Sequence, residues 1–112
     1  MEAEINQVID FTHLWTDATG NPESVDSPTF SIFKIEGTGT VLTQETVYGP
    51  VTPAEVSTGR YAVSVTIDDT FEDGETYTAV FEGTDPGTSW LLHNEQRFRV
   101  VASKGLRSSF ID

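Results

Sequence analysis

Two short segments constrain the fold of this chain more than any other feature. Residues 58–65 read Thr-Gly-Arg-Tyr-Ala-Val-Ser-Val, and residues 74–81 read Gly-Glu-Thr-Tyr-Thr-Ala-Val-Phe. In a β-strand, this spacing places each tyrosine and the alternate apolar residues after it on one face. Both segments are therefore predicted to be strands with a buried face, and the stretch 68–73 between them is a polar turn. Neighbouring strands of this kind favour a small all-β sandwich.

Strand-forming and turn-forming stretches alternate along the whole chain. The strands are predicted at 5–15, 28–35, 40–48, 60–68, 75–83 and 91–102, with a short edge strand or loop at 50–56. Clusters of Gly, Pro, Asn and Asp predict turns at 17–22, 37–39 and 83–87, and Gly49-Pro50 is expected to interrupt the chain. We predict an all-β fold, an immunoglobulin-like Greek-key β-sandwich of about seven strands with almost no helix, and an open barrel is the alternative.

The length of 112 residues suits one domain with a single core. We expect residues 1–9 to form an N-terminal arm or first strand and residues 10–102 to form the sandwich. Residues 103–112 follow as a C-terminal tail that still carries Leu106, Phe110 and Ile111. Apolar residues in a terminal segment predict docking, either on the chain's own sandwich or on a neighbouring subunit.

The chain is strongly acidic, with a formal net charge of −12. Residues 1–90 carry two basic and sixteen acidic groups, whereas residues 91–112 carry four basic and two acidic groups. An acidic surface repels phosphate backbones, so we expect no nucleic-acid partner. The basic end could instead dock on an acidic surface, including that of a second copy. A solvated charged face or a halophilic source would produce the same imbalance.

The sequence contains few features that indicate a cellular compartment. There is no cysteine, and no apolar stretch approaches the roughly 18 residues that span a membrane, so no membrane partner is expected. The acidic start Met1-Glu2-Ala3-Glu4 does not resemble a secretory signal, which predicts synthesis in a cytoplasm without a signal peptide.

Few residues offer catalytic or metal chemistry. His13 and His93 lie in predicted strands, outside any nucleophile elbow or zinc-ligand spacing, so we expect no enzyme activity and no cofactor. The turn 68–75 holds five carboxylates, which could bind calcium or could simply keep an exposed turn soluble. Its spacing does not match the twelve-residue calcium loop, and no metal is assigned there.

The aromatic residues have two interpretations. Tyr61 and Tyr77 are expected in the core, with hydroxyls bonded to nearby backbone, and either could be the corner tyrosine of an immunoglobulin-like fold. Trp90 follows the predicted turn 83–87 and is the aromatic residue that we expect to be most exposed. An exposed tryptophan can stack on a sugar ring, so a carbohydrate- or receptor-binding module of a fibre or cell surface is the alternative function.

The order of these motifs resembles small immunoglobulin-like accessory proteins of tailed bacteriophages. The matching residues are Phe11, Thr12, Asp17, Gly20 and Pro22; Phe30 and Ile32; Thr58, Gly59, Tyr61, Val63 and Val65; Gly74, Tyr77, Phe81 and Gly83; and Glu95, Phe98 and Val100. The resemblance covers about residues 10–101, and each motif is a strand or turn signature. Similar phrases also occur in bacterial surface repeats.

The resemblance implies a non-enzymatic virion structural protein: a capsid decoration or cement protein, or a neck, tail or fibre accessory. Its expected partners are other virion proteins, and its expected form is a homo-oligomer such as a trimer. Many copies would strengthen weak contacts through effective concentration. The expected contact elements are the N-terminal segment and the tail, through Ile5, Val8, Lys104, Leu106, Arg107 and Phe110.

Overall fold

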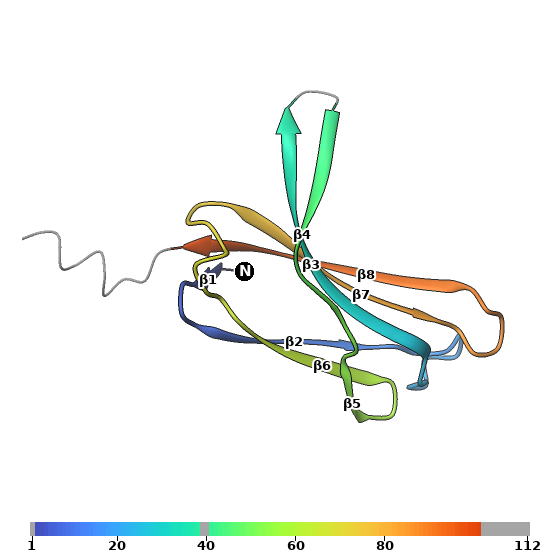
Figure 1. The fold of residues 1–112 in the computed structure, drawn as a ribbon. Coiled ribbons are helices and arrows are strands. Elements are labelled where there is room, and N and C mark those ends of the chain that lie inside the picture. The colour runs from blue at the N-terminus through green and yellow to red at the C-terminus, as the bar shows by residue number, and fades with distance from the viewer. Residues whose placement is uncertain (1, 39–40, 102–112) are drawn as a thin grey trace, which may run out of the picture.

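The computed structural model of this chain describes residues 2–38 and 41–101 (Figure 1). These residues form eight β-strands and no helix, which confirms the predicted all-β class. The strands are β1 (Glu2–Glu4), β2 (Val8–Leu14), β3 (Asp26–Thr38), β4 (Val41–Val51), β5 (Ala54–Ser57), β6 (Arg60–Thr66), β7 (Thr76–Thr84) and β8 (Leu91–Val101). No helix within the described ranges has the length and apolar character needed to cross a membrane.

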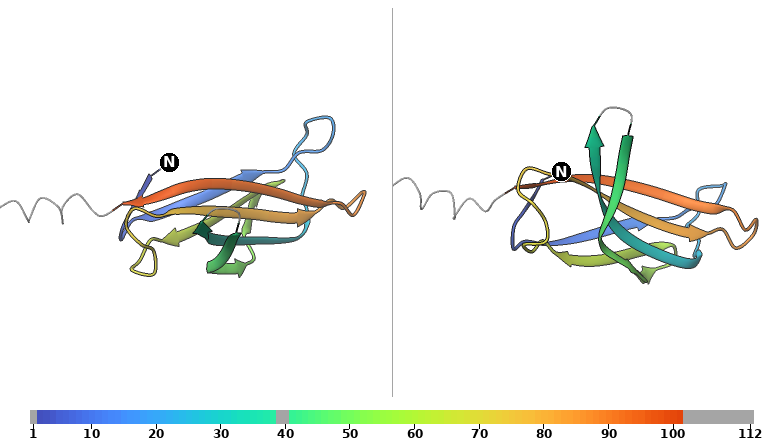
Figure 2. Two further views of the ribbon diagram at one scale, coloured as in Figure 1. Left: turned by 90° about the horizontal axis from the view of Figure 1, so that it is seen from above. Right: turned by 45° about the horizontal axis from the view of Figure 1, so that its top comes forward.

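The strands form two sheets that face each other. One sheet has five strands in the order β1-β8-β7-β3-β4, and the other has three in the order β2-β6-β5. All neighbouring strands are antiparallel except β1 and β8, which run parallel. Figure 2 shows the two layers from two further directions. The fold is therefore built from two sheets and is consistent with a sandwich.

The core lies between the two sheets and is largely aromatic. Phe11 of β2 contacts Phe30 of β3 and Phe98 of β8, with ring centroids 5.4 and 5.3 Å apart. Phe30 also lies 4.8 Å from Phe81 of β7. Tilted rings at these distances are a favourable aromatic geometry and bury large apolar areas. Phe11 thus links the three-stranded sheet directly to β3 and β8 of the five-stranded sheet.

The two tyrosine segments that predicted the fold become β6 and β7. Their tyrosines and the alternate apolar residues are buried, as expected, except that Val63 is only partly buried, and the two strands lie in different sheets. The Tyr77 hydroxyl accepts a hydrogen bond from the Glu72 backbone N–H at 2.7 Å. The Tyr61 hydroxyl accepts one from the Val25 N–H at 3.1 Å. The prediction of core tyrosines bonded to nearby backbone is confirmed for both residues.

The start of the strand predicted at 5–15 is wrong. Strand β2 begins only at Val8 and pairs with β6, whereas a separate strand, β1, lies before the predicted start and pairs with β8. Asn6 adopts a left-handed conformation with φ of 74° and donates its N–H to the Ile67 carbonyl. Asn tolerates this conformation better than most residues, so the chain can turn there between two sheets. The structure therefore has one strand more than predicted.

The turn predicted at 37–39 is also wrong in its position. Strand β3 continues to Thr38, and its pairing with β4 extends to the Thr38–Val41 pair. Its pairing with β7 ends earlier, at Lys34 and Tyr77. Beyond that point β3 and β4 form a two-stranded ribbon that extends past the sandwich (Figure 1). We call residues 35–38 and 41–44 the ribbon.

Gly49-Pro50 does not end the strand that contains it. Strand β4 continues to Val51, and the pairing with β3 shifts between Phe30–Val51 and Ile32–Tyr48. The Gly49–Pro50 peptide is cis, and this register shift accommodates the two residues as an irregularity within the ladder. The short strand predicted after it is β5, which lies at the edge of the smaller sheet. The last strand ends at Val101. Residue 102, which was predicted to be its final residue, lies outside the described residues.

Candidate functional site

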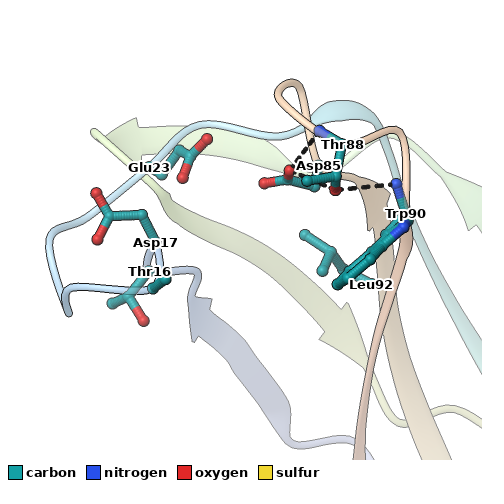
Figure 3. Close-up of a pocket in the computed structure, with 8 residues that line it drawn as sticks. Thr16, Asp17, Glu23, Asp85, Thr88, Trp90 and Leu92 are labelled. Atoms are coloured by element: carbon teal, nitrogen blue, oxygen red, sulfur yellow. Dashed lines mark hydrogen bonds between the residues drawn. The ribbon is translucent and has the colours of Figure 1, made fainter.

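A pocket of about 340 Å³ opens at one end of the sandwich. It lies between the β2–β3 connection and the β7–β8 connection, which approach each other there (Figure 3). Its lining residues are Thr16, Asp17, Ala18, Glu23, Asp85, Thr88, Trp90 and Leu92. A concave site with an apolar wall and a few polar groups is the ordinary form of a ligand pocket.

Asp85 orders the β7–β8 side of this pocket. One oxygen of its carboxylate, Oδ2, accepts hydrogen bonds from the Thr88 N–H at 2.8 Å and from the Thr88 hydroxyl at 2.7 Å. The Asp85 N–H donates to the Trp90 carbonyl at 2.8 Å, which closes the loop. These bonds fix the backbone on both sides of Trp90. Trp90 nevertheless remains 72% exposed, so this loop presents an aromatic side chain to solvent from a hydrogen-bonded backbone.

Asp17 orders the opposite side of the pocket in a similar way. Its Oδ1 accepts bonds from the Thr19 N–H at 2.9 Å, the Thr19 hydroxyl at 2.7 Å and the Asn21 N–H at 3.0 Å. These bonds, led by the Thr19 hydroxyl, lower the pKa of Asp17. The bond from the Thr88 hydroxyl is the largest cause of the lowered pKa of Asp85. Both carboxylates are therefore ionised over the whole neutral range.

Glu23 is the acidic lining residue whose carboxylate is not used to hold a loop. Within the part of the chain that the structure describes, this carboxylate has no hydrogen-bond or ion-pair partner. Its carboxylate and that of Asp85 flank the upper side of the pocket in Figure 3, above Trp90 and Leu92. No lysine, arginine or histidine is among the lining residues. The site thus suits a group with an apolar face and several hydrogen-bond donors, as in a sugar ring or a cationic side chain.

The two histidines lie outside the pocket and have opposite pKa shifts. His13 is half-buried beside Trp15, with ring centroids 4.3 Å apart, and burial followed by the charge of Arg60 lowers its pKa. His93 lies on the outer face of β8, 3.0 Å from a Glu82 oxygen and 3.3 Å from a Glu95 oxygen. The hydrogen bond to Glu82 is the largest cause of its raised pKa. Both environments are accounted for by packing and ion pairing.

The acidic turn 68–75 has structural contacts of its own. Asp68 Oδ1 accepts bonds from the Thr70 N–H at 3.0 Å and the Thr70 hydroxyl at 2.6 Å, and these bonds lower its pKa. Glu72 forms an ion pair with Lys34 at 3.1 Å. In residues 2–38 and 41–101, no group of three or more acidic or histidine side chains is arranged to hold a metal ion. The calcium interpretation of this turn gains no support.

The predicted contact residues have different positions. Ile5 packs against the core and donates its N–H to the Val101 carbonyl at 3.0 Å. The backbone at Ile5 is therefore still bonded to β8 of the five-stranded sheet. Val8 is 58% exposed at the start of β2, an edge strand. The tail residues predicted to make contacts lie outside the described residues: Lys104, Leu106, Arg107 and Phe110.

Trp90 is the predicted ligand-stacking residue, and its exposure agrees with that expectation. Sequence reasoning did not identify the acidic residues around it. The available signal was the short spacing of Asp85 and Thr88, and of Asp17 and Thr19, which is typical of side chains that close turns. That signal predicts two ordered turns, although it does not show that the turns meet.

No protein-family model, no curated protein and no solved structure shows a significant match to this chain.

Proposed function

We propose that this chain is a non-enzymatic virion structural protein, a capsid decoration or cement protein or a neck or tail accessory. It would act by binding other virion proteins through complementary surfaces, in many copies. The proposal starts from the motif order of residues 10–101, which resembles small immunoglobulin-like phage accessory proteins. Its structural support is the arrangement of the sheets and, above all, the ribbon.

The strand order supports an immunoglobulin-like assignment. Strands β8, β7 and β3 are neighbours in one sheet and face β2, β6 and β5 in the other. This order corresponds to the G-F-C strands of an immunoglobulin-like sandwich opposite its B-E-D strands. Tyr77 stands near the start of the strand equivalent to F, and its hydroxyl bonds back to the Glu72 backbone. That bond has the form of the tyrosine corner of such folds.

The ribbon is the observation that carries the structural role. Its two strands pair with each other after the pairing with β7 has ended, so one edge of β3 and one edge of β4 lack a described strand partner there. An isolated two-stranded ribbon is marginally stable in water, and free strand edges readily accept another strand. An arm of this kind is suited to lie on a neighbouring subunit, where its backbone groups gain partners.

Mass spectrometry of purified virions from the source tests this proposal. The expected result is that the chain remains in the particle through density-gradient purification, at a stoichiometry of many copies per particle. A minor-capsid or tail protein of known copy number in the same sample provides the internal standard. Absence of the chain from washed particles, with the standard retained, would overturn the virion assignment.

Trp90 favours a second candidate function, a carbohydrate- or receptor-binding module. This residue is 72% exposed and lies beside two carboxylates, and this combination can stack on a sugar ring and accept its hydroxyl protons. A glycan array tests this function directly. Specific binding by the wild-type chain that disappears in Trp90→Ala would support it, with Trp15→Phe as a folded aromatic control.

A further inference from the structure

The pocket beside Trp90 is acidic. Asp17, Glu23 and Asp85 surround it, and no cationic residue lines it. The Glu23 carboxylate has no partner among the described residues. The indole of Trp90 offers a π-face to a cation, and guanidinium groups bind both aromatic faces and carboxylates well. Together the concave shape, the aromatic wall and the free carboxylate fit an arginine side chain.

The chain carries arginines that match this description. Arg97 and Arg99 are exposed on β8, on the face opposite the buried Phe98 and Val100. Neither guanidinium forms an ion pair within the described ranges. The molecule therefore presents an acidic aromatic pocket and, on the strand that follows it, two exposed arginines that form no ion pair among the described residues. These two surfaces are complementary in charge.

These arginines cannot reach the pocket of their own molecule. Strand β8 starts directly after Trp90 and runs away from the pocket. At about 3.3 Å per residue, Arg97 lies roughly 23 Å and Arg99 roughly 30 Å along the strand from Trp90. The β7–β8 loop is fixed by the Asp85 bonds, so it does not bridge that distance. If Arg97 or Arg99 enters the pocket, it must therefore come from another molecule.

We propose that the pocket binds Arg97 or Arg99 of a second copy of this chain. This inference rests on the proposed function, because it specifies the contact through which the structural protein assembles. The contact joins two different surfaces, one at the end of the sandwich and one on the outer face of β8. A two-fold dimer can form this contact twice, and a head-to-tail arrangement closes into a ring such as a trimer when the rotation between copies closes. Each copy would then donate one arginine pair and accept another.

Sedimentation equilibrium of the full chain tests the proposal by charge reversal. The wild type should associate more strongly at about 50 mM than at about 500 mM NaCl, since salt screens the contact. Glu23→Lys should weaken association by about tenfold or more, because it places a cation where the arginine binds. The double variant Arg97→Glu/Arg99→Glu should have a similar effect. Combining all three changes in one chain should restore association, because the cation introduced at position 23 would then face an acidic partner surface.

Matched controls separate this contact from general charge effects. Glu45→Lys reverses an exposed carboxylate on β4, which lies outside the pocket lining and three positions from β8 in the sheet, and should leave association unchanged. Trp90→Ala removes the exposed indole without touching the core, and should weaken association with an unchanged unfolding temperature. Circular dichroism of every variant checks that the fold is intact.

Three results would overturn the inference. The first is a wild-type chain that stays monomeric at low salt and high concentration. The second is association that is unaffected by Glu23→Lys. The third is glycan binding that depends on Trp90, which would assign the pocket to a sugar. The mass spectrometry of virions is independent of all three, so a chain that is retained in particles while these variants associate normally would leave the proposed function intact.

Discussion

Replacing Tyr77 with phenylalanine tests the physical account of the fold at a single atom. The Tyr77 side chain is 1% exposed, and its ring packs against Phe71 and Phe98 with centroids 5.0 and 5.7 Å apart. Phenylalanine keeps these ring contacts and removes the hydroxyl that accepts the Glu72 N–H at 2.7 Å. The substitution therefore isolates one hydrogen bond between the 68–75 turn and β7.

The expected loss is about 1–1.5 kcal/mol in the free energy of unfolding, the usual value of one such bond. It stays at this modest level because Glu72 is exposed, so water can reach the region of its freed N–H. In a domain of this size, the loss lowers the unfolding midpoint by about 5 °C. Urea and thermal unfolding followed by circular dichroism measure both quantities.

Two further tyrosines provide matched controls. Tyr61→Phe removes the bond to the Val25 N–H and should cost a similar amount. Tyr48 is half-buried and has no hydrogen-bond partner for its hydroxyl among the described residues, so Tyr48→Phe should change stability by less than about 0.5 kcal/mol. Equal losses in Tyr48→Phe and Tyr77→Phe would contradict this prediction, because the loss of stability would then not depend on the partner of the hydroxyl.

The remaining predictions concern the core, one turn and one ion pair. Phe11→Ala should cost about 3–5 kcal/mol in urea unfolding, since it empties the aromatic centre between the sheets. Gly59→Ala should lower the free energy of unfolding by about 2–4 kcal/mol, because φ at Gly59 is 75° and the new Cβ would lie 2.7 Å from backbone atoms of Trp15 and Glu23. Gly20 also has a positive φ but has open space around it, so Gly20→Ala should lower the same quantity by only about 1 kcal/mol. The raised pKa of His93 predicts that its ion pairs stabilise the fold fully below about pH 6.5 and lose this effect as pH rises through the pKa of the folded state. The difference in unfolding free energy between wild type and His93→Gln should therefore be larger at pH 5.5 than at pH 8.5, by less than about 1 kcal/mol because the pairs are exposed. An equal difference at both pH values would contradict this prediction.

Local sequence patterns predicted most strands because alternation reports directly which face is buried. Strand β6 shows this, since Tyr61 and Val65 are buried and Ser64 is exposed. In β7 the predicted face of Tyr77 is buried, but the opposite face, with Thr78 and Val80, is buried as well. The same reasoning failed at residues 5–7, because apolar alternation there does not mark where the chain leaves the five-stranded sheet, and β2 begins only at Val8. The pattern records burial, and it does not record which partner strand supplies it.

The ribbon shows a second limit of sequence reasoning. Gly37 and Gly39 indicated an early turn, since glycine clusters usually mark turns. In the structure, the pairing of β3 with β4 instead continues beyond Lys34, the residue at which the pairing of β3 with β7 stops. Whether a ladder extends beyond its sheet depends on the register of neighbouring strands, which local composition does not encode.

The pocket was predictable only in part. The exposure of Trp90 followed from its place after a turn, and the aspartate–threonine spacings indicated ordered loops. The meeting of Glu23 and Trp90 depends on the packing of connections that are more than sixty residues apart in sequence. No local signal contains that information, so the acidic, aromatic character of the site emerged from the tertiary structure alone.

Cryo-electron microscopy of purified virions tests the proposal that this sandwich assembles into particles through its surface. We expect symmetric density for the two-sheet fold, with the ribbon lying on a neighbouring subunit rather than extending into solvent. Density for the complete particle that leaves no place for this fold, or a ribbon without any protein neighbour, would contradict it.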